Sequence, residues 1–509
     1  MINIIEGHRY EGQIEFKISG NANITIGDKS IFIHRKNTLN SLHLDNVKVE
    51  IFKGEKKLEG KVVETISRFK TEFVGRVQIG KKSTFVILDN SKISVDFYIK
   101  GGLVAKDGQK VIVELTKWEG SKSPQGKITK ILGDAGDNDA EMNSIMYEYN
   151  LPVDFPQEVI NESELVPEVI TEKEISKRKD IRNVTTIGID PFDSKDADDT
   201  ISLEQEGDFS IVSVNIADVS HYVKEDSLID KEAYRRGTSV YLVDRFVSMF
   251  PNRLSNGICS LKSGSDKLAF TARFKIDKRG KIKERWFGRT VINVNRDYSY
   301  EQAQEIIETG VTNTDCDRVV LELDRIAKIL RKNRMSDNFL EISSLEVKFK
   351  LAEDNKKPIG VYFKGQVDSN KLIEEFMLLA NREVAKFIKG KGLPCVNRVH
   401  EKPDDDKLVN IKRVAENFGY KIDISDPLTT KSELNRLLKE VKDSPEENML
   451  STLVIRSQKK AIYSTDSLSG HYGLSFDDYC HFTSPIRRYS DVLVHRLLAK
   501  SLNNGGYIK

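Results

Sequence analysis

The chain has 509 residues, of which 39% are hydrophobic and 31% are charged, a composition typical of a folded protein with roughly two to four domains. It contains no uninterrupted apolar run of about 18 residues, and its N-terminus lacks the pattern of a signal peptide, so we expect neither a membrane span nor secretion. The net charge of +2 neither indicates nor excludes a nucleic-acid partner. The four cysteines form no C-x-x-C pair, which fits a cytoplasmic protein without a zinc site or a disulfide framework.

The first 135 residues are expected to form short alternating strands that belong to an internal repeat. Three segments recur at an offset of 64 to 66 residues, namely "IFIHR" with "FYIKG", "VKVEIFK" with "VIVELTK", and "GKVVETI" with "GKITKIL". This spacing predicts two tandem five-stranded β-barrels of the OB type, at residues 1–68 and 69–135. Aromatic and basic residues such as Phe32 and Arg35 would suit stacking and pairing with a single nucleic-acid strand, although Phe32 would equally suit a barrel core.

Residues 136–180 read as an acidic linker, broken by three prolines and containing one short helix near residues 143–149. From residue 181 to residue 509, helical and strand patterns alternate, which predicts one large mixed α/β domain. Apolar residues recur with helical spacing after Val319 and again after Ile373, where Asn370 is the expected N-cap and Gly390 lies just past the end. The sequence "SYEQ" at Ser299 predicts a capping box.

The segment "GIDPFDSKDADDTI" has five aspartates within ten residues: Asp190, Asp193, Asp196, Asp198 and Asp199. The Gly and Glu positions of an EF-hand are not met, and isoleucines on both sides place the cluster at the edge of a core rather than in a solvated loop. Helix capping would use one or two of these residues, but not all five. Carboxylates without a nearby histidine favour Mg²⁺ or Mn²⁺, and several of them together suit two-metal phosphodiester chemistry.

A second group of polar residues lies near the C-terminus, in "YCHFTSPIRRYSD". Arg487 and Arg488 follow a turn fixed by proline, with His481, Thr483 and Ser484 beside them. Arginine forks match phosphate and stabilise negative charge that develops in a transition state. The alternative is that one arginine forms a structural pair with Asp491.

Together the two motifs resemble the signatures of the ribonuclease II superfamily, whose catalytic unit is the RNB domain. The likeness runs from about Lys177 to Arg496 and includes "VNIADVSHYV", "LIEEFMLLANREVA" and "NRVHEKPDDDK" in the family's order. The paired barrels are similar to the tandem cold-shock domains of the family's bacterial ribonuclease R branch. The resemblance implies a processive, Mg²⁺-dependent 3′→5′ exoribonuclease that hydrolyses RNA to nucleoside 5′-monophosphates, including structured RNA with a 3′ overhang.

The resemblance also implies roles for individual residues. Asp190, Asp196, Asp198 and Asp199 would hold Mg²⁺, with Mn²⁺ as the alternative ion, and Asp198 would be the most critical for catalysis. Arg487 would contact the scissile phosphate, Tyr241 would pack on the 3′-terminal nucleotides, and either Glu374 or Glu375 would approach the terminal ribose. RNA binding is further expected to involve His481, Ser484 and Arg488. Contacts to ribose 2′-hydroxyls would favour RNA over DNA.

Members of the family continue past this point with closing helices and a third OB barrel, so we expect the catalytic domain to be truncated at its C-terminal end. We expect a monomer whose partner is RNA. Two alternatives remain: an RNA-binding protein on a catalytically weak RNB scaffold, and a nuclease directed at oligoribonucleotides or DNA.

Overall fold

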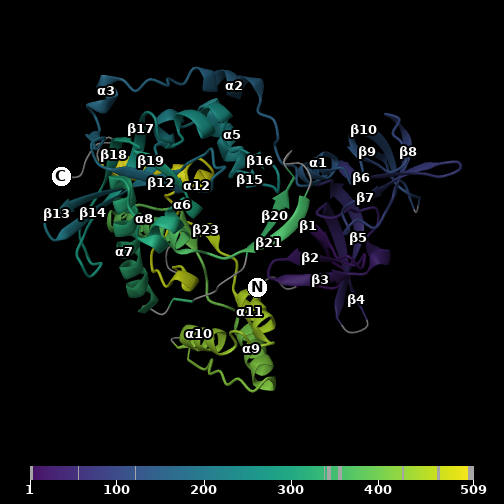
Figure 1. The fold of residues 1–509 in the computed structure, drawn as a ribbon. Helices are drawn as coiled ribbons and strands as arrows, with labels where there is room; N and C mark the ends of the chain where they lie inside the picture. The colour runs from purple at the N-terminus through teal and green to yellow at the C-terminus, as the bar shows by residue number, and fades with distance from the viewer. Residues whose placement is uncertain are drawn as a thin grey trace. The chain divides into compact units, whose positions relative to one another are not determined.

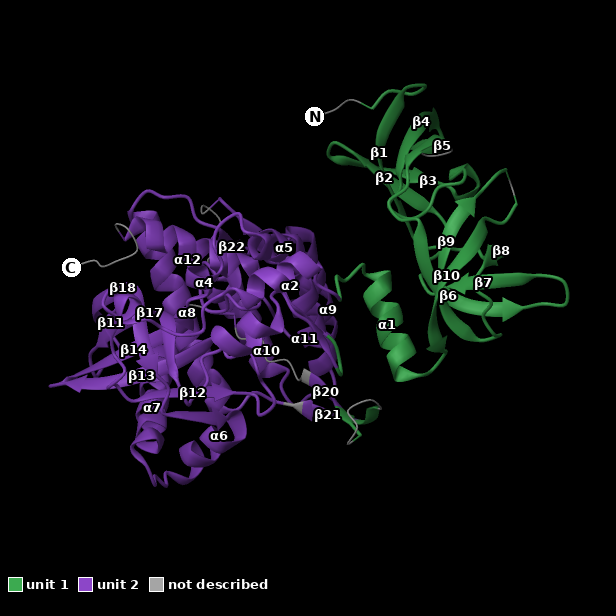
Figure 2. Cartoon of the chain, turned by 90° about the horizontal axis from the view of Figure 1, so that it is seen from above, with its two compact units in different colours: residues 1–153, 242–244, 350–360 green, residues 154–241, 245–349, 361–509 purple. Residues whose placement is uncertain are grey.

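The computed structural model describes residues 4–54, 57–120, 122–336, 339–340, 346–352, 358–426, 429–466 and 470–502. The chain forms two compact units (Figure 2). The first comprises residues 1–153, 242–244 and 350–360, and the second comprises residues 154–241, 245–349 and 361–509. No helix in the described ranges combines the length and the apolar character needed to cross a lipid bilayer.

The first unit contains two closed five-stranded barrels (Figure 1). The strands of the first barrel are β1 (Arg9–Phe16), β2 (Ala22–Ile26), β3 (Lys29–Ile33), β4 (Asn46–Lys53) and β5 (Leu58–Ser67). The strands of the second are β6 (Glu72–Ile79), β7 (Thr84–Leu88), β8 (Phe97–Gly102), β9 (Gln109–Lys117) and β10 (Gln125–Asp134). The predicted tandem barrels are therefore confirmed, and the expected division after residue 68 falls between β5 and β6.

The repeat extends to the packing inside each barrel. Gly60 on β5 and Gly126 on β10 occupy matching positions of the repeat. A Cβ atom at either glycine would collide with a valine of the neighbouring strand, Val49 on β4 or Val113 on β9. Both valines are fully buried, so each glycine allows the strands to approach closely over a filled core.

The segment between the barrels and the large sheet differs from the predicted linker. It contains three helices where one short helix was expected: α1 (Asn138–Glu148), α2 (Gln157–Glu164) and α3 (Glu172–Ile175). Helix α1 packs on the second barrel, where Lys110 Nζ lies 3.3 Å from Glu141 Oε2. The chain after α2 is held in the second unit by Arg253, whose guanidinium donates to the carbonyls of Ser163 and Val166. These helices depend on distant partners, which the local pattern does not reveal.

The second unit is built on a seven-stranded sheet with the order β11-β18-β17-β14-β13-β12-β19. Its strands are β11 (Lys179–Asp180), β12 (Thr186–Asp190), β13 (Asp199–Glu206), β14 (Phe209–Ala217), β17 (Asp266–Ile276), β18 (Ile282–Asn293) and β19 (Arg296–Ser299). Helices α6 (Tyr300–Thr309), α7 (Asp315–Ser336) and α8 (Asp368–Gly390) pack against the sheet and one another around a continuous apolar core. The predicted mixed α/β domain is confirmed.

The remaining strands and α-helices belong to the second unit, except that the two strands between residues 346 and 364 have residues in both units. They are α4 (Val219–Tyr222), α5 (Leu228–Arg236), β15 (Val240–Tyr241), β16 (Phe246–Val247), β20 (Glu346–Leu351), β21 (Pro358–Lys364), β22 (Asn397–Val399), α9 (Asp405–Asn417), α10 (Thr430–Glu440), α11 (Glu447–Ser457), β23 (Ile462–Ser464) and α12 (Tyr489–Ser501).

The predicted helix ends are only partly correct. Ser299 and Gln302 form the expected capping box at the start of α6. Helix α8, in contrast, begins at Asp368, and its N-cap position is occupied by Val367, three residues before the predicted cap. The Asn370 side chain instead accepts a hydrogen bond from the Val367 N–H at 3.2 Å, and Gly390 is the last residue of the helix rather than the first beyond it.

Candidate active site

The aspartate cluster lies where two neighbouring strands of the sheet begin and end. Asp190 is the last residue of β12 and Asp199 is the first residue of β13. These strands pair antiparallel, so their connection brings both carboxylates to the same end of the sheet. Asp196 and Asp198 lie on that connection, and Asp198 is only 5% exposed.

Most of the predicted site residues line a single cavity of about 460 Å³ in the second unit. Those that line it are Asp190, Asp196, Asp198, Asp199, Tyr241, Glu374, His481, Ser484, Arg487 and Arg488. Two residues of the predicted motifs are not among its lining: Asp193 is exposed on the loop, and Glu375 is buried elsewhere. The sheet, α8 and the segment before α12 all contribute to the cavity, so the two sequence motifs meet there.

Asp198 binds the arginine motif through both of its oxygens. Its Oδ1 accepts a hydrogen bond of 2.8 Å from the Ile486 N–H, and its Oδ2 lies 3.5 Å from Arg487 Nε. This Oδ2 is buried and has no hydrogen-bond partner. Burial raises the pKa of Asp198 well above its usual value, although Arg487 and the Ile486 N–H oppose the shift.

Asp190 and Asp199 form a second electrostatic pair in the cavity. Burial raises the pKa of Asp190 to about 6, while Lys262, whose Nζ lies 3.8 Å from its Oδ2, acts in the opposite direction. Burial and then the charge of Asp190 raise the pKa of Asp199 to about 8. A cation among these carboxylates would relieve both burial and repulsion.

The donor atoms of this cluster fit a hard cation in type, since all are carboxylate oxygens and one of them is buried without a partner. Their present spacing does not enclose an ion. Within the described ranges, no three His, Cys, Asp or Glu side chains are close enough together to hold one.

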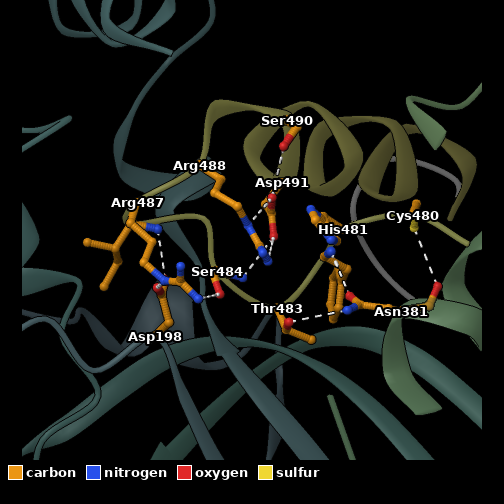
Figure 3. Close-up of polar contacts among 12 residues, drawn as sticks. Asp198, Asn381, Cys480, His481, Thr483, Ser484, Arg487, Arg488, Ser490 and Asp491 are labelled. Carbon is orange, nitrogen blue, oxygen red and sulfur yellow. Dashed lines mark hydrogen bonds and ion pairs between the residues drawn. The ribbon is translucent and has the colours of Figure 1, made fainter. Parts of the chain in front are cut away.

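Of the two neighbouring arginines, Arg487 is the one that points toward Asp198 (Figure 3). Its Nη2 also donates to Ser484 Oγ at 2.9 Å, and its side chain is 43% exposed. Arg488 instead forms a bidentate pair with buried Asp491, at 3.0 and 2.8 Å. The alternative that one arginine forms a structural pair with Asp491 therefore applies to Arg488. This residue lines the cavity, but its guanidinium is already paired with that carboxylate.

Ser484 and His481 both form hydrogen bonds with other residues of the protein. The Ser484 N–H donates to Asp491 Oδ1 at 2.9 Å. His481 Nδ1 lies 2.7 Å from the Tyr463 hydroxyl, and burial, followed by the charge of Arg488, lowers the pKa of His481 to about 3. The imidazole is therefore neutral at physiological pH.

Tyr241 connects the aspartate loop to an aromatic pair. Its hydroxyl donates to Asp196 Oδ2 at 2.7 Å, and its ring stacks on Phe246 with centroids 5.8 Å apart. Burial and the hydrogen bond to Asp196 raise the pKa of Tyr241. The side chain is 53% exposed, so a ring face remains available at the edge of the cavity.

The structure separates the two adjacent glutamates of α8. Glu374 lines the cavity, and burial raises the pKa of its carboxyl. Glu375 is 4% exposed and forms a buried ion pair with Arg334 of α7. Of the two glutamates considered from the sequence, Glu374 is therefore the one that lies at the cavity.

Several lining residues were not identified from the sequence. They are Tyr300 at the start of α6, Asn381 on α8, and Tyr479 before the arginines. Asn381 lies seven residues after Glu374, and residues at this spacing share one face of a helix. The helical periodicity could therefore have identified Asn381 from the sequence. It could not have identified Tyr300, because the pairing of β19 with β12 brings that residue to the cavity.

Comparisons with known proteins concern the domains and the fold of the chain. The RNB domain matches residues 178–504, and the cold shock domain matches residues 85–156. Ribonuclease R of Thermotoga maritima is 38% identical over 97% of this chain and 71% of its own length; that of Aquifex aeolicus is 34% identical over 94% and 68%. The solved apo form of Mycoplasma genitalium RNase R has a TM-score of 0.90 at 23% identity and covers 97% of this chain and 79% of its own, a likeness in fold.

Proposed function

The chain belongs to the ribonuclease II superfamily of exoribonucleases, and we propose that it hydrolyses RNA processively from the 3′ end, with Mg²⁺, to nucleoside 5′-monophosphates. The observation that carries this proposal is the contact of the buried Asp198 carboxylate with Arg487 inside one acidic cavity. A phosphodiester bound there would be contacted by the guanidinium, and the carboxylates would hold the divalent cations. Cations and a guanidinium together stabilise the negative charge that develops in phosphoryl transfer.

In this proposal, each group of residues has a separate task. Asp190, Asp196 and Asp199, together with Asp198, would hold Mg²⁺, with Mn²⁺ as the alternative ion. When bound, the metal would supply an activated water and charge stabilisation at the leaving oxygen. Arg487 would bind a non-bridging oxygen of the scissile phosphate, since its guanidinium is partly exposed and faces the cavity.

Other side chains would hold the RNA strand. The exposed ring of Tyr241, backed by Phe246, offers a stacking surface for a terminal base. Glu374 would accept a hydrogen bond from the terminal ribose, which would favour RNA over DNA. The two barrels of the first unit would bind the strand further from its 3′ end, including RNA with a structured 5′ portion and a 3′ overhang. In this proposal the protein acts as a monomer in the cytoplasm. Its four free cysteines fit that reducing compartment.

A test compares labelled RNA with DNA of matching sequence, in Mg²⁺ and in EDTA. We expect stepwise shortening of RNA in Mg²⁺, with no shortening in EDTA and little of DNA. Mononucleotide products should carry a 5′-phosphate. Products ending in a 3′-phosphate, or equal digestion of DNA, would refute the proposed chemistry.

A second candidate is an RNA-binding protein on a catalytically weak RNB scaffold. It is favoured by one observation: among the described residues, the carboxylates are not spaced tightly enough to enclose an ion. This candidate predicts RNA binding without shortening in the same assay, at any Mg²⁺ or Mn²⁺ concentration.

A further inference from the structure

Asn381 is a buried polar residue on the face of α8 that lines the cavity. It is 3% exposed and lies on the same helix as Glu374. A buried amide is costly unless both its donor and its acceptor groups find partners. The partners of Asn381 all lie on one short segment, residues 479–483, which precedes the arginines.

The side chain of Asn381 binds this segment at three points, of which the contact with Thr483 is labelled in Figure 3. Its Oδ1 accepts from the Phe482 N–H at 2.8 Å, and its Nδ2 donates to the Tyr479 hydroxyl at 3.2 Å and to Thr483 Oγ1 at 3.5 Å. Its backbone carbonyl accepts a further hydrogen bond of 3.5 Å from Cys480 Sγ.

The segment held by Asn381 continues directly into the groups that orient Arg487. Ser484 follows Thr483, and its Oγ accepts from the guanidinium of Arg487. Two residues later, the Ile486 N–H donates to Asp198. A displacement of residues 479–483 would therefore be transmitted through a few covalent bonds to the position of the guanidinium.

We propose that Asn381 is a positioning residue, which fixes the loop that carries Arg487 against α8 and thereby aligns the guanidinium with Asp198. This inference rests on the proposed function, because it assigns to Asn381 an effect on the same reaction. Asparagine suits the position since it offers an acceptor to the Phe482 N–H and donors to two hydroxyls at once. An apolar residue of similar size would leave the Phe482 N–H without an acceptor.

The loop keeps a second attachment when Asn381 is replaced. His495 of α12 donates from Nε2 to the Phe482 carbonyl at 2.7 Å. Asn381→Ala should therefore fold, with the loop displaced rather than detached. A misplacement on the order of 1 Å costs about 100-fold in rate. We expect kcat for RNA shortening to fall by about that factor, with KM within about threefold because strand binding is unaffected.

A conservative variant and a matched control separate positioning from stability. Asn381→Asp keeps the acceptor for Phe482, and the hydroxyls of Tyr479 and Thr483 can rotate to donate to it. The kcat of Asn381→Asp should therefore be at least about tenfold higher than that of Asn381→Ala. Thr290→Val removes a buried hydrogen bond to Thr271 within the sheet, away from the cavity lining. It should lower the melting temperature without lowering kcat.

A double-mutant cycle with Arg487→Ala gives the decisive readout. If Asn381 acts through Arg487, Asn381→Ala should slow the Arg487→Ala enzyme by less than about threefold. Full additivity of the two losses would overturn the inference, as would a wild-type kcat in Asn381→Ala. An inactive wild-type protein would instead refute the proposed function, so the two failures are distinguishable.

Discussion

Asp198 and Arg487, which come from motifs far apart in the sequence, contact each other inside the cavity, with 3.5 Å between Oδ2 and Nε. The carboxylate also binds the backbone N–H of Ile486, the residue before the arginine. Asp198 therefore contacts both the backbone and the side chain of the arginine loop. Both contacts oppose the rise in the pKa of Asp198 that burial causes, so both favour the ionised form of this carboxyl group.

The first prediction concerns Asp198. Asp198→Asn keeps an acceptor for the Ile486 N–H but loses the negative charge, so the protein should fold and bind RNA while kcat falls by about 100- to 10,000-fold. RNA shortening and RNA binding should be measured on the same preparation. Asp193→Asn is the matched control, since Asp193 is exposed on the same loop and outside the cavity lining. Equal losses in the two variants would contradict the assignment.

The second prediction concerns pH. Asp190 and Asp199 have pKa values of about 6 and about 8 in the folded protein, above the value of about 3.9 for an unfolded aspartate. Between about pH 4 and pH 8 these two carboxyl groups therefore bind more protons in the folded state than in the unfolded chain, and their contribution to metal-free stability should fall as the pH rises.

Mg²⁺ should reverse this loss, because it binds the ionised carboxylates and stabilises the folded state. Thermal unfolding should thus show a larger Mg²⁺-induced rise in melting temperature at pH 8 than at pH 6. Asp199→Asn should reduce the pH dependence, and Asp193→Asn should preserve it. A stabilisation by Mg²⁺ that is the same at both pH values would argue against binding at this pair.

The third prediction separates the adjacent glutamates of α8. Glu375→Ala leaves the buried guanidinium of Arg334 without its partner and should lower the free energy of unfolding by about 3–5 kcal/mol. Glu374→Gln should change that free energy little but reduce the preference for RNA over DNA. Chemical denaturation and paired RNA and DNA assays measure the two effects. The assignment fails if Glu374→Gln retains full preference for RNA.

The fourth prediction concerns the stacking surface at Tyr241. Tyr241→Ala should weaken binding of a short RNA by about 1–3 kcal/mol, or about 5- to 150-fold, and lengthen the final product. Tyr241→Phe keeps the ring and loses only the hydrogen bond to Asp196, so it should retain most of the affinity. Titration of a short labelled RNA and sizing of end products provide the measurements. Similar losses in both variants would show that the hydroxyl, not the ring, matters.

The sequence predicted the features that depend on local spacing. The capping box at Ser299 and the grouping of Asp190 with Asp199 follow from residues close together in the chain, and the two barrels follow from a repeat at a constant offset. The position of Arg487 beside Asp198 could be expected only through the resemblance, because no local pattern relates residues so distant in sequence.

Features decided by tertiary packing were not predictable. Glu374 and Glu375 are about 100° apart around one helix, and only the position of Arg334 on α7 determines which of them is paired. Arg487 and Arg488 differ in the same way, since Asp491 engages one of them. The three short helices between residues 138 and 175 have weak local signals and are stabilised by distant contacts.

The most direct test of the central claim follows one RNA carrying a label at either end, in Mg²⁺, with the wild-type protein. We predict that the 3′ label is released at once as a mononucleotide while the 5′ label is retained on progressively shorter RNA. Early release of the 5′ label, or large fragments that retain the 3′ label, would contradict a 3′→5′ exoribonuclease.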